Sequence, residues 1–230
     1  MRMLNSIRND MKFQQKYGFY IVYMIITLSY IGILLFLPNS IRDVVKGIIL
    51  FSDPAALGMF FMGAIILFEK SERVLDSIFV SPIKVDEYIL SKVFSLSLIS
   101  TTVGLAVVLA TKFTTGNLVS LIIGLMLGSI FFSLIGLIVA VRVNSLNRFM
   151  LGIIPLGTII SFPPFLLFFD INNFILEIFP SVIIMKLILA GVGIVEINYV
   201  YSVVLIGWIF IFWLWARRNV IKMIKSLSGI

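Results

Sequence analysis

The chain of 230 residues contains no cysteine and no histidine. It therefore cannot form a disulfide, a thiolate nucleophile, a histidine haem ligand or a zinc site of the usual kind. Intramembrane proteases that need a histidine partner or a zinc ligand are excluded for the same reason. The sequence also lacks a GxxxxGKS or GxxxxGKT pattern, so the chain has no phosphate-binding loop with which to hold ATP itself.

Charge is scarce as well. Only 13% of the residues are charged, 60% are hydrophobic, and the mean hydropathy is +1.15. Because soluble domains are about 45–50% apolar, this composition predicts an all-α integral membrane protein. No cluster of nucleophile, base and oxyanion donors can be assembled from its few polar residues, which argues against an enzyme. The net charge of +7 is better explained by membrane topology than by nucleic acid.

The first 16 residues predict an amphipathic helix in the membrane interface. Leu4, Ile7 and Met11 share one helical face, and four basic residues occupy the rest of the segment. A frayed tail with scattered apolar residues is the alternative. Residues 19–37 follow without any charge, and 19 residues of helix are long enough to cross the hydrocarbon core. No small-residue cleavage site follows them, so we expect a membrane anchor and not a removed signal peptide.

Six membrane spans are predicted in one transmembrane domain, residues 1–230, without a nucleotide-binding domain. After the first span, residues 41–46 are expected to form a short loop on the far side. The later spans are predicted at residues 48–68, 90–111, 118–141, from 149 to the Pro163-Pro164 pair, and 199–215. The fourth carries small residues about four apart, which let membrane helices approach closely. They are Gly124, Gly128, Ser129, Ser133 and Gly136.

Asp53 and Pro54 lie near the start of the second span. An Asp at an N-cap followed by Pro at the first helical position is typical of a helix start, so the helix is expected to begin at Pro54, after an irregular entry at residues 48–51. A carboxylate inside a membrane is costly and often functional, so Asp53 as a ligand for a substrate or an ion is the alternative.

The segment from residue 165 to 196 is apolar but does not form a clean span. Pro163, Pro164 and Pro180 break helices, and Asp170, Glu177 and Lys186 interrupt the apolar runs. We expect re-entrant or interfacial helices at the outer face, because backbone at membrane depth must find partners in protein or in a water-filled cavity. A seventh span at residues 178–195 is the alternative, and it would place the C-terminus outside.

Lysine and arginine positions set the orientation. With six spans, all but four of the 18 basic residues fall on one side, which also holds both termini and the segment at residues 69–92. The four on the other side are Arg42, Lys46, Lys112 and Lys186. The positive-inside rule therefore predicts that both termini and residues 69–92 are cytoplasmic. Seven spans would send four C-terminal cations outside, which is why six are preferred.

Residues 69–92 are far longer than a turn between helices requires. Val74, Ile78 and their apolar neighbours recur at helical spacing, and Ser81-Pro82 then stops the helix. Val85, Ile89 and Val93 begin a second helical stripe that continues into the next span. The pattern predicts a surface helix that docks onto a cytoplasmic partner. An ordinary solvated connection with a chance amphipathic stripe is the alternative.

At this point the sequence resembles a known family. The motifs are Phe51-Ser-Asp-Pro54, a span ending at Glu69, then Leu75-Asp-Ser-Ile-Phe-Val-Ser-Pro82 and Glu87-Tyr-Ile-Leu-Ser-Lys92. They resemble those of ABC-2 type permeases, the membrane subunits of ATP-driven exporters. Tyr17-Gly-Phe-Tyr-Ile-Val-Tyr23 and Trp215-Ala-Arg-Arg218 are most similar to the fluoroquinolone export permease group. One departure is that Arg73-Val74 stands where the family usually has Gly-Thr.

The resemblance implies the ABC-2 exporter fold, with six spans, an N-terminal interfacial helix, a cytoplasmic coupling helix and re-entrant helices before the last span. It implies that the coupling helix sits in a groove of a separate ATPase, which would bind ATP and Mg²⁺, while this chain binds no cofactor or metal and catalyses no reaction. A second permease chain, identical or paralogous, is also implied. The coupling residues carried over are Glu69, Arg73, Val74, Leu75, Asp76, Ile78, Phe79, Ser81, Pro82 and Glu87.

The function expected is export of a hydrophobic or amphipathic small molecule across the plasma membrane of a prokaryote by alternating access. Drugs, peptides, lipids and glycan precursors all suit apolar walls. An ion-driven secondary transporter would want polar residues near the bilayer midplane, and the spans have almost none. A membrane scaffold or immunity protein that sequesters a peptide remains an alternative, and independence of ATP hydrolysis would distinguish it.

Overall fold

The computed structural model describes residues 2–53, 57–72, 74, 84–111, 116–169, 174–196 and 198–227, and the regular elements within them are all helices. Five segments are long and apolar enough to cross a membrane. They are α2 (Phe19–Phe36), α6 (Val85–Ala110), α7 (Leu118–Ala140), α8 (Leu146–Ser161) with the 3₁₀ turn that follows it, and α11 (Val200–Leu227). They confirm the first, third, fourth, fifth and last predicted spans as membrane helices.

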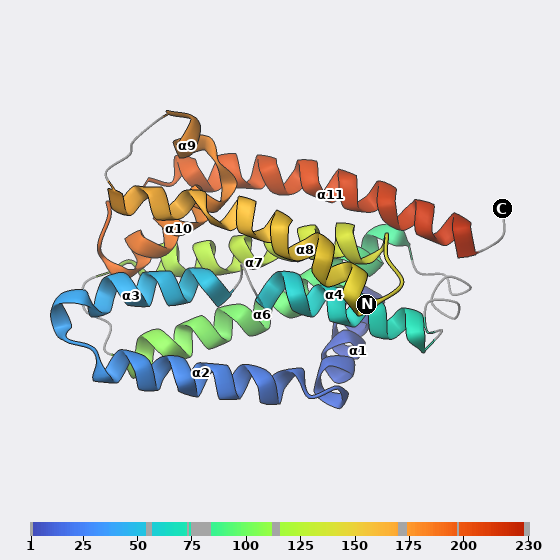
Figure 1. Cartoon of the computed structure of the whole chain (residues 1–230), viewed down its shortest axis with the longest axis horizontal. Coiled ribbons are helices and arrows are strands. Elements are labelled where there is room, and N and C mark those ends of the chain that lie inside the picture. The colour runs from blue at the N-terminus through green and yellow to red at the C-terminus, as the bar shows by residue number, and fades with distance from the viewer. Residues whose placement is uncertain are drawn as a thin grey trace.

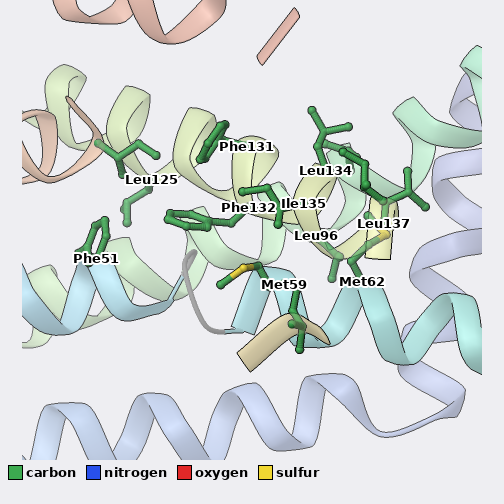
Figure 2. Close-up of a cluster of buried hydrophobic side chains, with 14 of the residues drawn as sticks. Phe51, Met59, Met62, Leu96, Leu125, Phe131, Phe132, Leu134, Ile135 and Leu137 are labelled. Carbon is green, nitrogen blue, oxygen red and sulfur yellow. The ribbon is translucent and has the colours of Figure 1, made fainter. Parts of the chain in front are cut away.

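α7 forms the centre of the bundle and packs against α4 (Gly58–Ser71), α6, α11 and α10 (Pro180–Val192). Its small residues allow this. A Cβ atom on Gly136 would lie 2.4 Å from the backbone oxygen of Met59, and one on Gly128 would lie 2.8 Å from Ile184. Phe132 of α7 projects between Phe51 and Met59 (Figure 2), and its ring meets the Phe51 ring edge-on at 5.9 Å between centroids. The close packing predicted from the small residues is therefore confirmed.

The predicted loop at residues 41–46 is wrong, and so is the irregular entry at residues 48–51. Both stretches belong to one helix, α3 (Asn39–Ser52). The charged residues suggested a loop, but the helix satisfies them locally: Arg42 donates to the Leu37 carbonyl at 2.7 Å, and Lys46 donates to Asp43 at 3.0 Å. The apolar face buries Leu50 and Phe51, so the segment is an amphipathic helix.

The predicted second span is divided between two helices. α3 ends at Ser52 and α4 begins at Gly58, and the two lie end to end along the bundle (Figure 1). Each has 14 residues and is too short to count as a span by itself. Pro54 lies outside the described residues. A sixth crossing made of α3 and α4 together remains a prediction.

The proline pair ends α8 as predicted. The helix stops at Ser161, and the 3₁₀ helix η2 (Pro163–Phe169) follows. A short helix, α9 (Phe174–Ile178), precedes α10, which has Pro180 in its first turn. Every α10 residue except Lys186 is buried. With 13 residues, α10 is shorter than the alternative seventh span at residues 178–195. That α10 is re-entrant remains a prediction.

Both ends of the chain lie toward the same end of the bundle (Figure 1). α1 (Arg2–Lys16), the C-terminal part of α11 and the connection from α7 to α8 are found there, while α9 and the turn from α2 to α3 lie at the opposite end. α1 runs across the long helices and not along them. The first end, which we call the basic end, thus collects the segments that hold most of the lysines and arginines.

Candidate coupling site at the basic end

Lys92 stands at the centre of a buried charged cluster at the basic end. Its side chain on α6 is 2% exposed, and its Nζ donates to Asp10 Oδ1 of α1 at 2.9 Å and to Glu69 of α4. A buried ammonium group is costly unless its charge is paired and its protons are accepted. One lysine therefore fastens three helices at the point where the predicted coupling segment leaves α4 and enters α6.

Tyr88 completes this group of four residues, which we call the Lys92 cluster (Asp10, Glu69, Tyr88 and Lys92). The Tyr88 hydroxyl donates to Glu69 Oε2 at 2.8 Å, so each carboxylate oxygen of Glu69 accepts a hydrogen bond. Its ring centroid also lies 4.8 Å from Lys92 Nζ, within the range of a cation–π contact. The cluster is thus a buried network with its main polar groups satisfied, the condition under which such networks are rigid.

Two further contacts hold α1 against the bundle. The buried Gln14 side chain donates to Ser95 Oγ of α6 at 2.8 Å. The Tyr17 hydroxyl, just after α1, donates to the Glu72 carboxylate, and the Tyr17 ring stacks on Phe68 with 5.2 Å between centroids. The Glu72 hydrogen bond raises the pKa of Tyr17 above its usual value, because it favours the protonated phenol. The N-terminal helix is therefore joined to both ends of the coupling segment.

Lys70 joins α4 to the end of the central helix. Its Nζ donates to the carbonyls of Ala140, Val141 and Val143 at 3.0, 3.0 and 2.7 Å. These carbonyls stand at the C-terminal end of α7, where the helix leaves acceptors unpaired and carries partial negative charge. The lysine therefore works as a C-terminal cap supplied by a neighbouring helix.

The last helix is tied to the same end. Arg217 Nε of α11 lies 2.9 Å from Asp86 Oδ1 in the first turn of α6, and both side chains are exposed. Arg142, just after α7, donates through Nε to Asn219 Oδ1 at 2.8 Å and lies over the Trp215 ring. A displacement of the segment that connects α4 to α6 would therefore be transmitted to α1, α7 and α11.

The structure places three of the predicted coupling residues. Glu69 is in the Lys92 cluster, Val74 is half-buried, and Glu87 accepts a hydrogen bond at 3.0 Å from the Lys84 backbone N–H, which caps the start of α6. The others lie outside the described residues and remain predictions: Arg73, Leu75, Asp76, Ile78, Phe79, Ser81 and Pro82.

Sequence reasoning gave no role to Asp10, Lys70, Tyr88 or Lys92. A signal was present for Lys92, because it stands at the beginning of a long apolar run where an unpaired lysine would be costly. Asp10 is the only acid in an otherwise basic helix. Their pairing follows only from the packing of α1 against α6, which no spacing in the sequence reveals.

Asp53 lies away from the basic end, between α3 and α4. Its side chain is buried, and its Oδ2 accepts a hydrogen bond from Ser100 Oγ of α6 at 2.7 Å. Because Pro54 lies outside the described residues, the predicted helix start at that position, with Asp53 as its cap, remains a prediction.

The opposite end of the bundle has its own polar link. Lys186 Nζ of α10 lies 2.9 Å from Glu177 Oε1 of α9 and 3.2 Å from the Tyr201 hydroxyl of α11. Partial burial acts to lower the pKa of Lys186, but the bonds to Glu177 and Tyr201 outweigh it and raise the pKa above its usual value. This link joins the short helices that begin after Pro163 and Pro164 to the last helix, and Pro180 starts the one that carries Lys186.

Two apolar grooves lie along the bundle. One, of about 230 Å³, is lined by residues of α3, α4, α8 and η2 that include Phe51, Met59 and Phe165. The other, of about 270 Å³, lies between α6, α7 and α11 and includes Val93 and Trp213. Within the described residues no three carboxylates come close enough to hold a metal ion. Both grooves offer a small molecule mainly apolar walls.

The comparisons with known proteins agree with one another. The model of the fluoroquinolones export permease protein family matches residues 1–225. Among curated proteins, the chain is similar to the fluoroquinolones export permease proteins of two strains of Mycobacterium tuberculosis. Each is 29% identical over 164 residues, which cover 71% of this chain and 69% of the relative.

Proposed function

Because the chain belongs to the fluoroquinolones export permease protein family, we propose that it is the membrane-spanning subunit of an ATP-driven exporter, powered by a separate ATPase. That it is a multi-pass membrane protein of an export permease family rests on the family match and on the five apolar helices. Two parts of this function are proposed: the ATPase partner, which would bind ATP and Mg²⁺, and the alternating-access mechanism.

The Lys92 cluster is the observation that carries the proposal. It lies at the base of the segment from residue 69 to residue 92 and joins the helices on both sides of that segment to α1. A buried network with satisfied partners moves as a unit, since separating one charge from its partner is costly. Motion imposed on the coupling segment by an ATPase would therefore be passed to α1, α4 and α6 together, which is what a coupling device requires.

The topology of the proposal is six crossings with both termini in the cytoplasm of a prokaryotic cell. The five long helices are joined by a sixth crossing composed of α3 and α4, which lie end to end (Figure 1). Most basic residues then face the cytoplasm, as the positive-inside rule favours. α9 and α10 lie at the outer end, where they form the proposed re-entrant segment.

The proposed transport unit contains two permease chains, identical or paralogous, and two ATPase subunits. ATP binding would close the ATPases, and their motion would rock the permease chains about their interface, so that the path opens to alternate sides. The cargo is a hydrophobic or amphipathic small molecule. The names of the two relatives give fluoroquinolones as the molecules that they export. The apolar grooves between the helices suit such molecules.

The test is a site-specific crosslink. Because the chain has no native cysteine, Ser77→Cys would carry the only thiol. In membranes that contain candidate ATPases from neighbouring genes, it should crosslink to one of them with a yield that changes on ATP addition. Ile194→Cys, an exposed position after α10 at the opposite end, is the matched control and should give no such adduct. Correctly inserted protein without a crosslink anywhere from residue 74 to residue 82 would refute coupling and favour the scaffold or immunity alternative.

A further inference from the structure

Among the buried polar atoms of the described residues that have no hydrogen-bond partner, one belongs to a carboxylate, Asp53, and one to the hydroxyl of Tyr23. Asp53 is 2% exposed, and although its Oδ2 accepts from Ser100, its Oδ1 accepts no hydrogen bond within the described part of the chain. The Tyr23 side chain of α2 is equally buried, and its hydroxyl is also unpaired. Nearly all buried polar groups in proteins have partners, so two orphans among helices that pack together point to something that both would contact.

The charge of Asp53 is also unbalanced. Among the described residues two acids are buried, Glu69 and Asp53. Glu69 is paired with Lys92, whereas no lysine or arginine of the described helices lies within ion-pair distance of Asp53. A buried carboxylate without a cation is costly, and in membrane proteins such residues mark pathways for ions and substrates. A cationic group in contact with Oδ1 would balance this charge.

The position of Asp53 at the end of α3 makes its negative charge still more costly. Asp53 follows the last residue of α3, where a helix carries partial negative charge. Phe51 and Ser52, which directly precede Asp53, line the groove of about 230 Å³. Thr27 of α2 and Thr102 of α6 line a further groove of about 370 Å³, and each is within about one turn of Tyr23 or Ser100.

We propose that Asp53 and Tyr23 form the binding point for the cationic group of an amphipathic cargo, a substituted ammonium attached to an apolar body. This inference rests on the proposed export function and narrows its substrate class. Asp53 Oδ1 supplies the charge, the Tyr23 hydroxyl, which interacts electrostatically with Asp53, supplies a second polar contact, and Ser100 holds the second carboxylate oxygen in place. The apolar grooves accept the rest of the molecule. Because Oδ1 is enclosed in this structure, binding requires that the helices around Asp53 separate.

The experiment measures binding by the purified full-length chain in lipid nanodiscs, without any ATPase. Two dansyl probes are compared that differ only in their end groups, one trimethylammonium and the other the uncharged tert-butyl group of the same shape. The native chain is expected to bind the cationic probe on the order of tenfold more tightly than the neutral one. Asp53→Asn keeps an oxygen for Ser100 and should abolish this preference while leaving the affinity for the neutral probe unchanged.

A matched control makes the result specific. Glu196→Gln removes one negative charge from an exposed position outside the proposed site and should keep the cationic preference. Equal binding of both probes by the native chain would overturn the proposal even if Asp53→Asn failed to fold. Competitive displacement of the cationic probe by sodium would overturn it too, because the occupant would then be an inorganic ion. Since no ATPase takes part, these outcomes are independent of the crosslinking test.

Discussion

Lys92 serves two carboxylates at once, so the members of its cluster are not equivalent. Removing the lysine leaves both Asp10 and Glu69 without their cation, with side chains 15% and 4% exposed. Removing the charge of Glu69 leaves Lys92 paired with Asp10. The asymmetry follows from burial, because a charge that loses its partner inside the protein keeps the full cost of its desolvation.

We therefore expect Lys92→Met to lower the free energy of unfolding by about 3–5 kcal/mol and Glu69→Gln to lower it by clearly less. The measurement is thermal unfolding of the purified chain in detergent. Arg217→Met is the control, because it breaks an exposed pair with Asp86 and should cost about 0–1 kcal/mol. Equal losses for Lys92→Met and Arg217→Met would show that the cluster is not a buried network.

At the scale of elements, contact between α4 and α7 decides how closely the bundle packs. Gly136 presents no side chain where the backbone of Met59 crosses α7. Association of helices in a membrane depends on this kind of close approach, since lipid chains are as apolar as leucine and provide no hydrophobic drive. A methyl group at Gly136 would meet backbone, which cannot rotate away, whereas one at Gly63 would meet the ring of Phe149.

Gly136→Ala should consequently separate α4 from α7 and destabilise the fold by about 1–3 kcal/mol, the usual cost of overpacking. Gly207→Ala in α11 is the matched control, since no atom lies within 4 Å of the added methyl group, and it should cause no loss. Unfolding midpoints of the two variants in the same detergent provide the comparison. A Gly136→Ala protein as stable as the native chain would mean that this close approach does not limit packing.

At the scale of the whole molecule, the helices are joined by different kinds of contact at the basic end and at the opposite end. The basic end joins five helices through charged side chains. At the opposite end an ion pair joins α9 to α10, and hydrogen bonds of Tyr201 and Trp208 join these short helices to α11. In the proposed topology, the contacts at the basic end would face the proposed ATPase and those at the opposite end would face the exterior.

Topology can be tested with single cysteines in this cysteine-free chain. In intact cells, an impermeant maleimide should label Glu196→Cys, and it should label Asn144→Cys and Lys222→Cys only after the membrane is opened. All three positions are exposed, so access alone decides the result. Labelling of Lys222→Cys from outside would support an odd number of crossings and refute the six-span topology.

How far the sequence leads is clearest in the helices. Five of the six predicted spans appear as long apolar helices, because the length and composition of a span are imposed by the bilayer, and the Pro163-Pro164 break appears because proline removes a backbone donor. Residues 41–46 belong to α3 and not to a loop, because Arg42 and Lys46 find local partners and the apolar residues around them keep a helical period. A helix start at Pro54 inside the second span is predicted from the sequence, whereas the helix that precedes it, α3, is seen only in the structure.

Hydrophobicity, proline positions and charge bias are local properties, so the sequence alone was enough to predict a membrane protein of apolar helices with most of its basic residues on one side. Which polar residues meet depends on the tertiary structure. Lys92 is paired with Asp10 across 82 positions, Asp53 with Ser100 across 47, and Tyr23 is left unpaired in the interior. Such partnerships depend on the packing of whole helices around the small residues of α7, a property of the assembled bundle that no single stretch of sequence contains.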